Sequence, residues 1–257
     1  MKFNKLIITF TLFLFTLSSF AQQGSFTEKL LLSDRATGFG QNATGGANGE
    51  IITVTNRKEL LSALKKGSAR VICVKGQIDM TDTGRGTLLP QEVKGSNSRL
   101  DAKIAEITKN TALPVKNYGE WKQKYTGSFN YSENESGEVK SARVALNEFW
   151  KNLVEFNVLS NTTIVGVGSD SAIIGGALQI KNAENIIIRN LKIFNCYNPF
   201  PKIEDNDGLN ADLDCIAIKS SKNIWIDHCS ISSKFSHDQV ASDTYLTKDG
   251  EKVKWQV

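Results

Sequence analysis

Short runs in which apolar and polar residues alternate dominate the second half of the chain. Three of them align with one another: NTTIVGVG from Asn161, NIIIRNLKI from Asn185 and NIWIDHCSI from Asn223. Each has an asparagine, an apolar-x-apolar strand, two bend residues and a second apolar-x-apolar strand, and the asparagines are 24 and then 38 residues apart. LQIK (178–181) and IAIK (216–219) add a third strand before the later two copies. Such a repeat indicates a solenoid whose coils each have three short strands.

Each of these strands is too short to bury an apolar face alone, so we expect the coils to stack in parallel and to share one core. The expected columns place Ile186, Ile188, Leu191 and Ile193 above or below Ile224, Ile226, Cys229 and Ile231. Asparagine suits the repeated corner because it tolerates a left-handed backbone and can stack its amide on the next coil. From Asn161 onward the pattern predicts an all-β fold, a single-stranded parallel β-helix.

The segment before the repeat predicts a cap. Glycine-rich sequence at 38–49 leads into a β-branched strand at 51–55. Asn56 can then cap a short amphipathic helix within 57–66, and residues 70–78 alternate as a strand. Because a lone strand, helix and strand would expose much apolar surface, we expect this unit, with its short helix, to cover the first coil.

Residues 79–157 differ in character, since acids and bases are abundant there and β-branched residues are few. LDAKIAEIT (100–108) has the apolar spacing of a helix. The composition favours a charged surface excursion packed on the flank of the solenoid. The alternative is a separate carbohydrate-binding module, in which Trp121 would be the residue to examine.

The first residues predict a secretory signal peptide. Lys2 and Lys5 precede an apolar run that is shorter than the roughly 20 residues of a membrane-spanning helix, and small residues precede a cleavage position after Ala21. We therefore expect residues 1–21 to be removed and residues 22–257 to form one secreted domain, extracellular or periplasmic, without membrane attachment. Loss of the two lysines lowers the net charge from +4 to +2, and nothing in the composition calls for nucleic acid.

Cysteine and histidine limit the chemistry further. The chain has four cysteines, Cys73, Cys196, Cys215 and Cys229. In an oxidising compartment one or two disulfides remain open, although Cys215 and Cys229 occupy apolar coil positions that favour buried free thiols. His228 and His237 are the only two histidines in the sequence, so a metal site or catalytic triad built on histidine is not favoured.

The block from 160 to 230 resembles the pectate lyase family of right-handed parallel β-helices. The matching words are SNTTIVGVGSDSAIIGG, NIIIRNLKI, LDCIAIKSS and, most specifically, NIWIDHCS. The resemblance implies a monomeric polysaccharide lyase that breaks a carbon–oxygen bond of acidic plant polysaccharide, polygalacturonate or pectin, by Ca²⁺-dependent β-elimination. It also implies that the metal acidifies the proton on carbon 5 of the uronate and that an arginine removes it.

The resemblance assigns one metal ligand and suggests a second. Asp214 stands directly before the strand at 216–219 and matches the first calcium-ligating aspartate of the family. Asp212 lies two residues earlier, where some members carry another, and alternate residues of an extended segment share a face. Calcium prefers several oxygen ligands, of which carboxylates supply most of the charge. Both aspartates are therefore predicted metal ligands.

No residue of the chain matches the catalytic arginine, which together with the remaining calcium carboxylates and the C-terminal coils is expected beyond Val257. Arg189 lies in a bend far from Asp214 in coil order, and His228 is expected to serve structure within the WIDH word. Two alternatives remain open. One is another pectinolytic enzyme on this fold, a pectin lyase or a polygalacturonase with paired carboxylates. The other is a non-catalytic β-helix that binds acidic polysaccharide.

Overall fold

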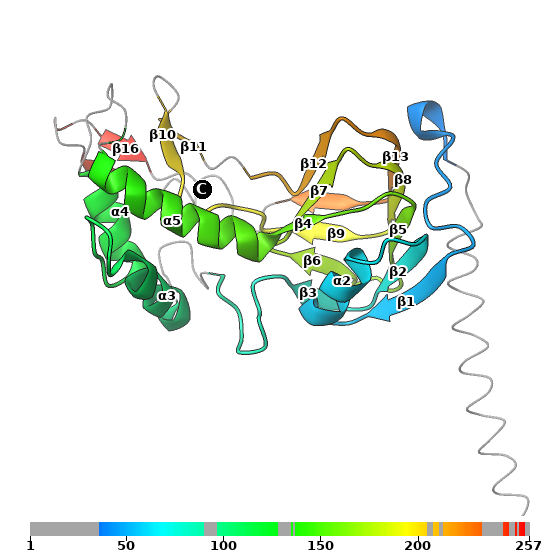
Figure 1. Ribbon diagram of the computed structural model, residues 1–257, viewed down its shortest axis with the longest axis horizontal. Coiled ribbons are helices and arrows are strands. Elements are labelled where there is room, and N and C mark those ends of the chain that lie inside the picture. The colour runs from blue at the N-terminus through cyan, green and yellow to red at the C-terminus, as the bar shows by residue number, and fades with distance from the viewer. Residues whose placement is uncertain are drawn as a thin grey trace, which may run out of the picture.

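The computed structural model describes residues 36–89, 97–127, 135, 137–204, 208–210, 213–232, 244–246, 250 and 252–254. In Figure 1 these residues form a stack of β-strand coils with α3 (Ser98–Thr108), α4 (Tyr118–Thr126) and α5 (Gly137–Val154) at one end of it and α2 (Arg57–Leu64) against the coils. The predicted signal peptide (1–21) lies outside the described residues, as do Asp205, Asp207 and the predicted metal ligand Asp212. Within the described part of the chain, none of the helices is long and apolar enough to cross a membrane.

Three parallel sheets run along the stack. The first contains β1 (Glu50–Val54), β2 (Arg70–Val74), β5 (Thr162–Gly166), β8 (Glu184–Arg189) and β13 (Lys222–Asp227). The second contains β4 (Glu155–Asn157), β7 (Ala177–Lys181) and β12 (Ile216–Lys219), and the third contains β3 (Gln77–Asp79), β6 (Ala172–Ile174), β9 (Lys192–Phe194) and β14 (Ser230–Ser232). From β2 onward, consecutive strands of these three sheets lie in different sheets and pair in parallel with strands of the neighbouring coils (Figure 1). The predicted parallel β-helix is confirmed.

The repeated asparagines form the corners of the coils. Asn161, Asn185 and Asn223 have φ angles of 57°, 62° and 55°, the left-handed region that asparagine tolerates better than most residues. The side-chain amide of Asn185 donates to Oδ1 of Asn161 at 2.8 Å, so the amides also stack from coil to coil. His228 takes the same backbone conformation as Asn190 one coil earlier, with φ angles of 50° and 47°.

The predicted core columns are present. Ile224 pairs with Ile186, Ile226 with Ile188 and Ile231 with Ile193. All four predicted residues of the earlier coil are buried: Ile186, Ile188, Leu191 and Ile193. In the later coil Ile226 and Ile231 remain 37% and 50% exposed. Burial of such columns is the main source of stability, at about 0.8 kcal/mol for each methylene removed from water.

The amino-terminal segment differs from its prediction in one respect. Helix α2 (Arg57–Leu64) begins after Asn56, whose side chain accepts a hydrogen bond from the backbone N–H of Glu59, as expected. Residues 70–78, however, form two strands, β2 and β3, because Gly76 turns the chain with a φ of 73°. Since these strands pair with β5 and β6, they belong to the first coil itself rather than to a cap over it. The pattern of alternation does not predict the corner at Gly76, because it continues across that residue.

The charged segment contains three helices, α3 (Ser98–Thr108), α4 (Tyr118–Thr126) and α5 (Gly137–Val154). The first confirms the helix predicted from LDAKIAEIT. Together they enclose a hydrophobic cluster that is separate from the core of the coils. Trp121 is fully buried there and stacks on Tyr125 with 4.9 Å between ring centroids, so it offers no ring face to a sugar. The boundaries 79–157 stay a prediction.

Shorter elements complete the described chain. They are a 3₁₀ turn (Gly38–Gly40) and the antiparallel pairs β10 (Lys202–Glu204) with β11 (Gly208–Asn210) and β15 (Thr244–Leu246) with β16 (Lys252–Lys254). The pair β10 and β11 belongs to an insertion between β9 and β12, defined here as residues 197–214. This insertion ends at Asp214, one of the two predicted metal ligands.

Candidate functional site

Asp214 lies just before the start of β12, a strand of the second sheet. The backbone N–H of Leu178 donates to the carbonyl of Cys215 at 2.9 Å, so pairing with β7 extends one residue before β12. Asp214 is the next residue out, and its side chain is exposed. No hydrogen bond or ion pair joins its carboxylate to the described residues, which leaves both oxygens open to a cation.

The helices hold both ends of the insertion. The buried indole of Trp150 donates to the carbonyl of Tyr197 at 2.7 Å, and the Asn198 amide donates to Oδ1 of Asn147 at 2.6 Å. Phe200 is fully buried in the helical cluster, and Leu213 packs against the same cluster from the other end of the insertion. The helical unit therefore supports the segment that carries the candidate ligand.

Two cysteine thiols lie next to Asp214. A hydrogen bond with Cys215, together with burial and the nearby Asp214 carboxylate, raises the pKa of the Cys196 thiol far above its usual range. The same hydrogen bond lowers the pKa of Cys215, against the opposing effects of burial and Asp214. All four cysteines are free thiols in this structure. Asp214 therefore lies beside the corner that carries Cys196 and Cys215.

The donor set fits calcium only in part. Calcium takes six to eight oxygen ligands in proteins, and the described residues contain no group of three histidine, cysteine, aspartate or glutamate side chains that could hold an ion. Asp214 supplies one open carboxylate, and Asp212 falls outside the described residues. The assignment of both aspartates as metal ligands stays a prediction.

A pair of lysines on the same sheet was missed by the sequence reasoning. Lys181 of β7 and Lys219 of β12 are direct neighbours in the register, and both are exposed. Neither makes an ion pair or a side-chain hydrogen bond within the described part of the chain, and stacked like charges repel each other. The available signal was that LQIK and IAIK end in lysine at the same position. At about 3.3 Å per residue, Lys219 lies about 16 Å along the strand from Asp214.

The WIDH motif (225–228) has a structural role. Asp227 accepts from the Arg189 guanidinium at 2.8 Å and lies 2.8 Å from Nδ1 of His228. The guanidinium also lies over the ring of Trp225, 4.7 Å from its centroid. These residues belong to the first sheet and the corner after it, whereas Asp214 belongs to the second. Because Arg189 is held in this ion pair, it is not available as a base for chemistry at Asp214.

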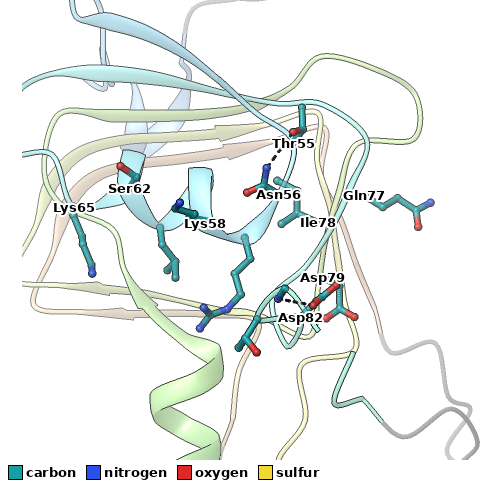
Figure 2. A pocket seen from close by; sticks show the side chains of 13 residues that line it. Thr55, Asn56, Lys58, Ser62, Lys65, Gln77, Ile78, Asp79 and Asp82 are labelled. Carbon is teal, nitrogen blue, oxygen red and sulfur yellow. Dashed lines mark hydrogen bonds between the residues drawn. The ribbon is translucent and has the colours of Figure 1, made fainter. Parts of the chain in front are cut away.

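A pocket of about 810 Å³ lies beside α2 and contains none of the predicted site residues. Figure 2 shows Lys58, Asp79 and Asp82 among its lining side chains. The two carboxylates serve local turns, because Asp79 accepts from the backbone N–H of Thr81 and Asp82 from that of Gly84, both at 2.8 Å.

Comparison with known proteins points to one family. A sequence profile of the family described as pectate lyase matches residues 92–256. A pectate lyase of Bacillus subtilis is 31% identical over 225 residues, which cover 82% of this chain and 49% of the relative. Pectate lyase E of Dickeya chrysanthemi is 44% identical over 98 residues, or 38% of this chain and 24% of the relative.

Solved structures give the same result. A pectate lyase of Acidovorax avenae subsp. citrulli superposes with a TM-score of 0.69 at 21% identity, covering 81% of this chain and 49% of that one, which supports the fold alone. A pectate lyase bound to a hexasaccharide superposes with a TM-score of 0.59 at 28% identity, covering 82% and 51%. The matched part thus spans about half the length of the Bacillus subtilis relative and of these two solved structures.

Proposed function

The chain belongs to the pectate lyase family, and we propose that the protein is a secreted lyase that cleaves polygalacturonate by calcium-dependent β-elimination. The observation that carries this proposal is the open carboxylate of Asp214 at the strand mouth that the family uses for its metal. We also propose that residues 1–21 direct export, that residues 22–257 form the pectate lyase-like domain, and that the protein acts as a monomer.

In this proposal Asp214 and Asp212 bind the ion from one side of the insertion. These two carboxylates would hold the calcium ion, and the chemistry that the ion would supply is to make the proton on carbon 5 of a uronate more acidic. The helical unit keeps Asp214 in place through its contacts with Tyr197 and Leu213. No described residue is assigned as the base that takes the proton.

The lysine pair supports an acidic polymer as the ligand. Lys181 and Lys219 lie side by side at the carboxyl ends of β7 and β12, and Asp214 precedes the start of β12. Cations without a partner among the described residues attract a polyanion. The same pair also favours the second candidate function, a β-helix that binds acidic polysaccharide without cleaving it. The two candidates differ in product, because only elimination leaves an unsaturated sugar that absorbs in the ultraviolet.

The metal assignment can be tested with Asp214→Asn. We expect the affinity for Ca²⁺, measured by calorimetric titration with polygalacturonate present, to fall at least about tenfold, which corresponds to about 1.4 kcal/mol. The thermal unfolding temperature should stay unchanged because the side chain is exposed. Asp170→Asn is the matched control, since it removes the same charge from an exposed loop between β5 and β6. Equal Ca²⁺ affinity in the Asp214 variant and the parent protein would refute the assignment.

The reaction is tested with a form of the protein that extends past Val257, because the catalytic arginine is expected there. Incubation of that form with polygalacturonate should produce ultraviolet absorbance that a calcium chelator abolishes. Reducing sugar without that absorbance would favour hydrolysis, and binding without either product would favour the non-catalytic candidate.

A further inference from the structure

The insertion interrupts one corner of the coil stack. In the coil of β6 and β7, the chain turns from the third sheet to the second through Gly175 and Gly176, and Ala177 begins β7. In the next coil the same corner lies between β9 and β12, where residues 197–214 are inserted. Cys196 directly precedes the insertion and Cys215 directly follows it.

The strand register places the two cysteines at neighbouring positions. Ile174 pairs with Phe194, so Cys196 stacks on Gly176. Leu178 pairs with Ile216, so Cys215 stacks on Ala177. Gly176 and Ala177 are consecutive residues, with Cα atoms about 3.8 Å apart. The cysteines therefore occupy adjoining positions although 18 residues lie between them in the sequence.

Hydrogen bonds confirm that the register continues through this corner. Gly175 N–H donates to the Phe194 carbonyl and Leu178 N–H to the Cys215 carbonyl, both at 2.9 Å. The Cys196 thiol donates to the Gly176 carbonyl at 2.6 Å. Both cysteine side chains also pack against the core of the coils. A disulfide needs Cα atoms about 4.4 to 6.8 Å apart, a span that adjoining positions of a stacked coil supply.

We propose that Cys196 and Cys215 form a disulfide that closes the insertion at its base. The oxidant is a low-molecular-weight disulfide such as oxidised glutathione. One cysteine thiolate attacks it to give a mixed disulfide and one free small thiol, and the second cysteine thiolate then displaces the other small thiol. Two protein thiols thus lose two protons and two electrons, and the small disulfide becomes two thiols.

The other two cysteines have different surroundings. Cys73 is buried in β2, and burial raises the pKa of its thiol to about 11. Cys229 lies at the corner between β13 and β14, where the backbone N–H of Ser230 donates to the Leu191 carbonyl. That corner joins the first sheet to the third, whereas Cys196 and Cys215 join the third to the second. Neither thiol competes for the proposed bond.

The cross-link would fix the residue beside it. Asp214 adjoins Cys215, so the disulfide would hold the carboxylate close to the first residue of β12, while the helices hold the rest of the insertion. The bond itself does not depend on lyase activity. Only its effect on calcium rests on the proposed function, and the two are measured separately.

The test uses the full chain without mutation first. The reduced protein is equilibrated with a glutathione redox buffer, free thiols are alkylated under denaturing conditions, and proteolytic peptides are mapped by mass spectrometry. We expect one cross-linked peptide pair joining Cys196 to Cys215, two hydrogen atoms lighter than the separate peptides, with Cys73 and Cys229 alkylated. Alkylation or separate glutathione adducts at Cys196 and Cys215, or a bond to another cysteine, would overturn the proposal.

Stability gives a second measurement. Oxidation should raise the thermal unfolding temperature of the parent protein by several degrees, because an 18-residue segment is closed. Cys229→Ser, the matched control, should keep this shift, and Cys196→Ser should lose it. An equal shift in both variants contradicts the assignment. If the cross-link forms and Ca²⁺ affinity is the same in both redox states, the disulfide stands and only its role near the metal fails.

Discussion

Replacement of Asn185 tests how the corners hold the stack together. Its Oδ1 accepts hydrogen bonds from the backbone N–H groups of Thr44 and Gly45 at 2.7 and 2.8 Å. Its Nδ2 donates to Oδ1 of Asn161 at 2.8 Å and to the Gly45 carbonyl at 3.2 Å. Asn185 thus joins the glycine-rich segment to two coils, and it does so with a left-handed backbone.

The two contributions can be separated by substitution. Asn185→Gly keeps the left-handed backbone and removes the amide, so the four hydrogen bonds above and a fifth one, from the Thr44 hydroxyl at 3.2 Å, are lost. At about 0.5 to 1 kcal/mol for each of the first four bonds, the free energy of unfolding should fall by about 2 to 4 kcal/mol. Asn185→Ala loses the same bonds and adds about 1 kcal/mol for a β-carbon in the left-handed region. Asn182 is the matched control, because its φ is 50° and its side chain makes no hydrogen bond to the described residues.

Urea unfolding of the four variants, followed by circular dichroism, gives the comparison. We expect Asn182→Gly to leave the free energy of unfolding nearly unchanged and Asn182→Ala to lower it by about 1 kcal/mol. At position 185, glycine should cost about 2 to 4 kcal/mol and alanine about 1 kcal/mol more. If glycine were as harmless at 185 as at 182, the amide bonds would not contribute, and the reasoning about the corner would be wrong.

Two further predictions concern the site and its support. The double variant Lys181→Gln with Lys219→Gln should weaken binding to polygalacturonate by about tenfold at low salt and reduce the salt dependence of the affinity, because it loses two cations that have no partner among the described residues. Lys222→Gln is the control, since Lys222 forms an ion pair with Glu184. An equal loss of affinity in the control would refute a specific role of the lysine pair. Trp150→Phe should lower the free energy of unfolding, measured by urea titration, by about 1 to 3 kcal/mol more than Trp121→Phe. The reason is that the Trp150 N–H donates to the Tyr197 carbonyl, whereas the buried Trp121 N–H has no partner in the described structure. Equal losses in the two variants would contradict this prediction.

Much of the fold was readable from the sequence because the coil repeat is local. Strand alternation, the asparagine corners and the inward columns each depend on a few adjacent residues, and all three were predicted correctly. The first coil was not recognised, since Gly76 breaks 70–78 into two strands and the pattern of alternation continues across the break. The helix at 98–108 followed from its spacing, but the cluster that the three helices share depends on contacts between distant segments.

The site was less readable. Asp214 was identified by resemblance, and its exposure at the strand mouth agrees with a ligand role without testing it. The contacts of Trp150 with Tyr197 and of Asn147 with Asn198 join residues 47 and 51 apart, which no local pattern could reveal. The adjacency of Cys196 and Cys215 also required the register of the sheets, because the insertion hides it in the sequence.

The two supports of the molecule should therefore be separable by experiment. Asn185 stabilises a corner of the first sheet, whereas the insertion that ends at Asp214 attaches to the second sheet and to the helices. Folded Asn185→Gly should bind Ca²⁺ with the affinity of the parent protein even though it unfolds more easily. Trp150→Phe removes a contact that holds the insertion itself, so a loss of Ca²⁺ affinity should accompany its loss of stability. Such a difference would indicate that the helical unit acts on the site through the insertion and not through the stability of the whole chain.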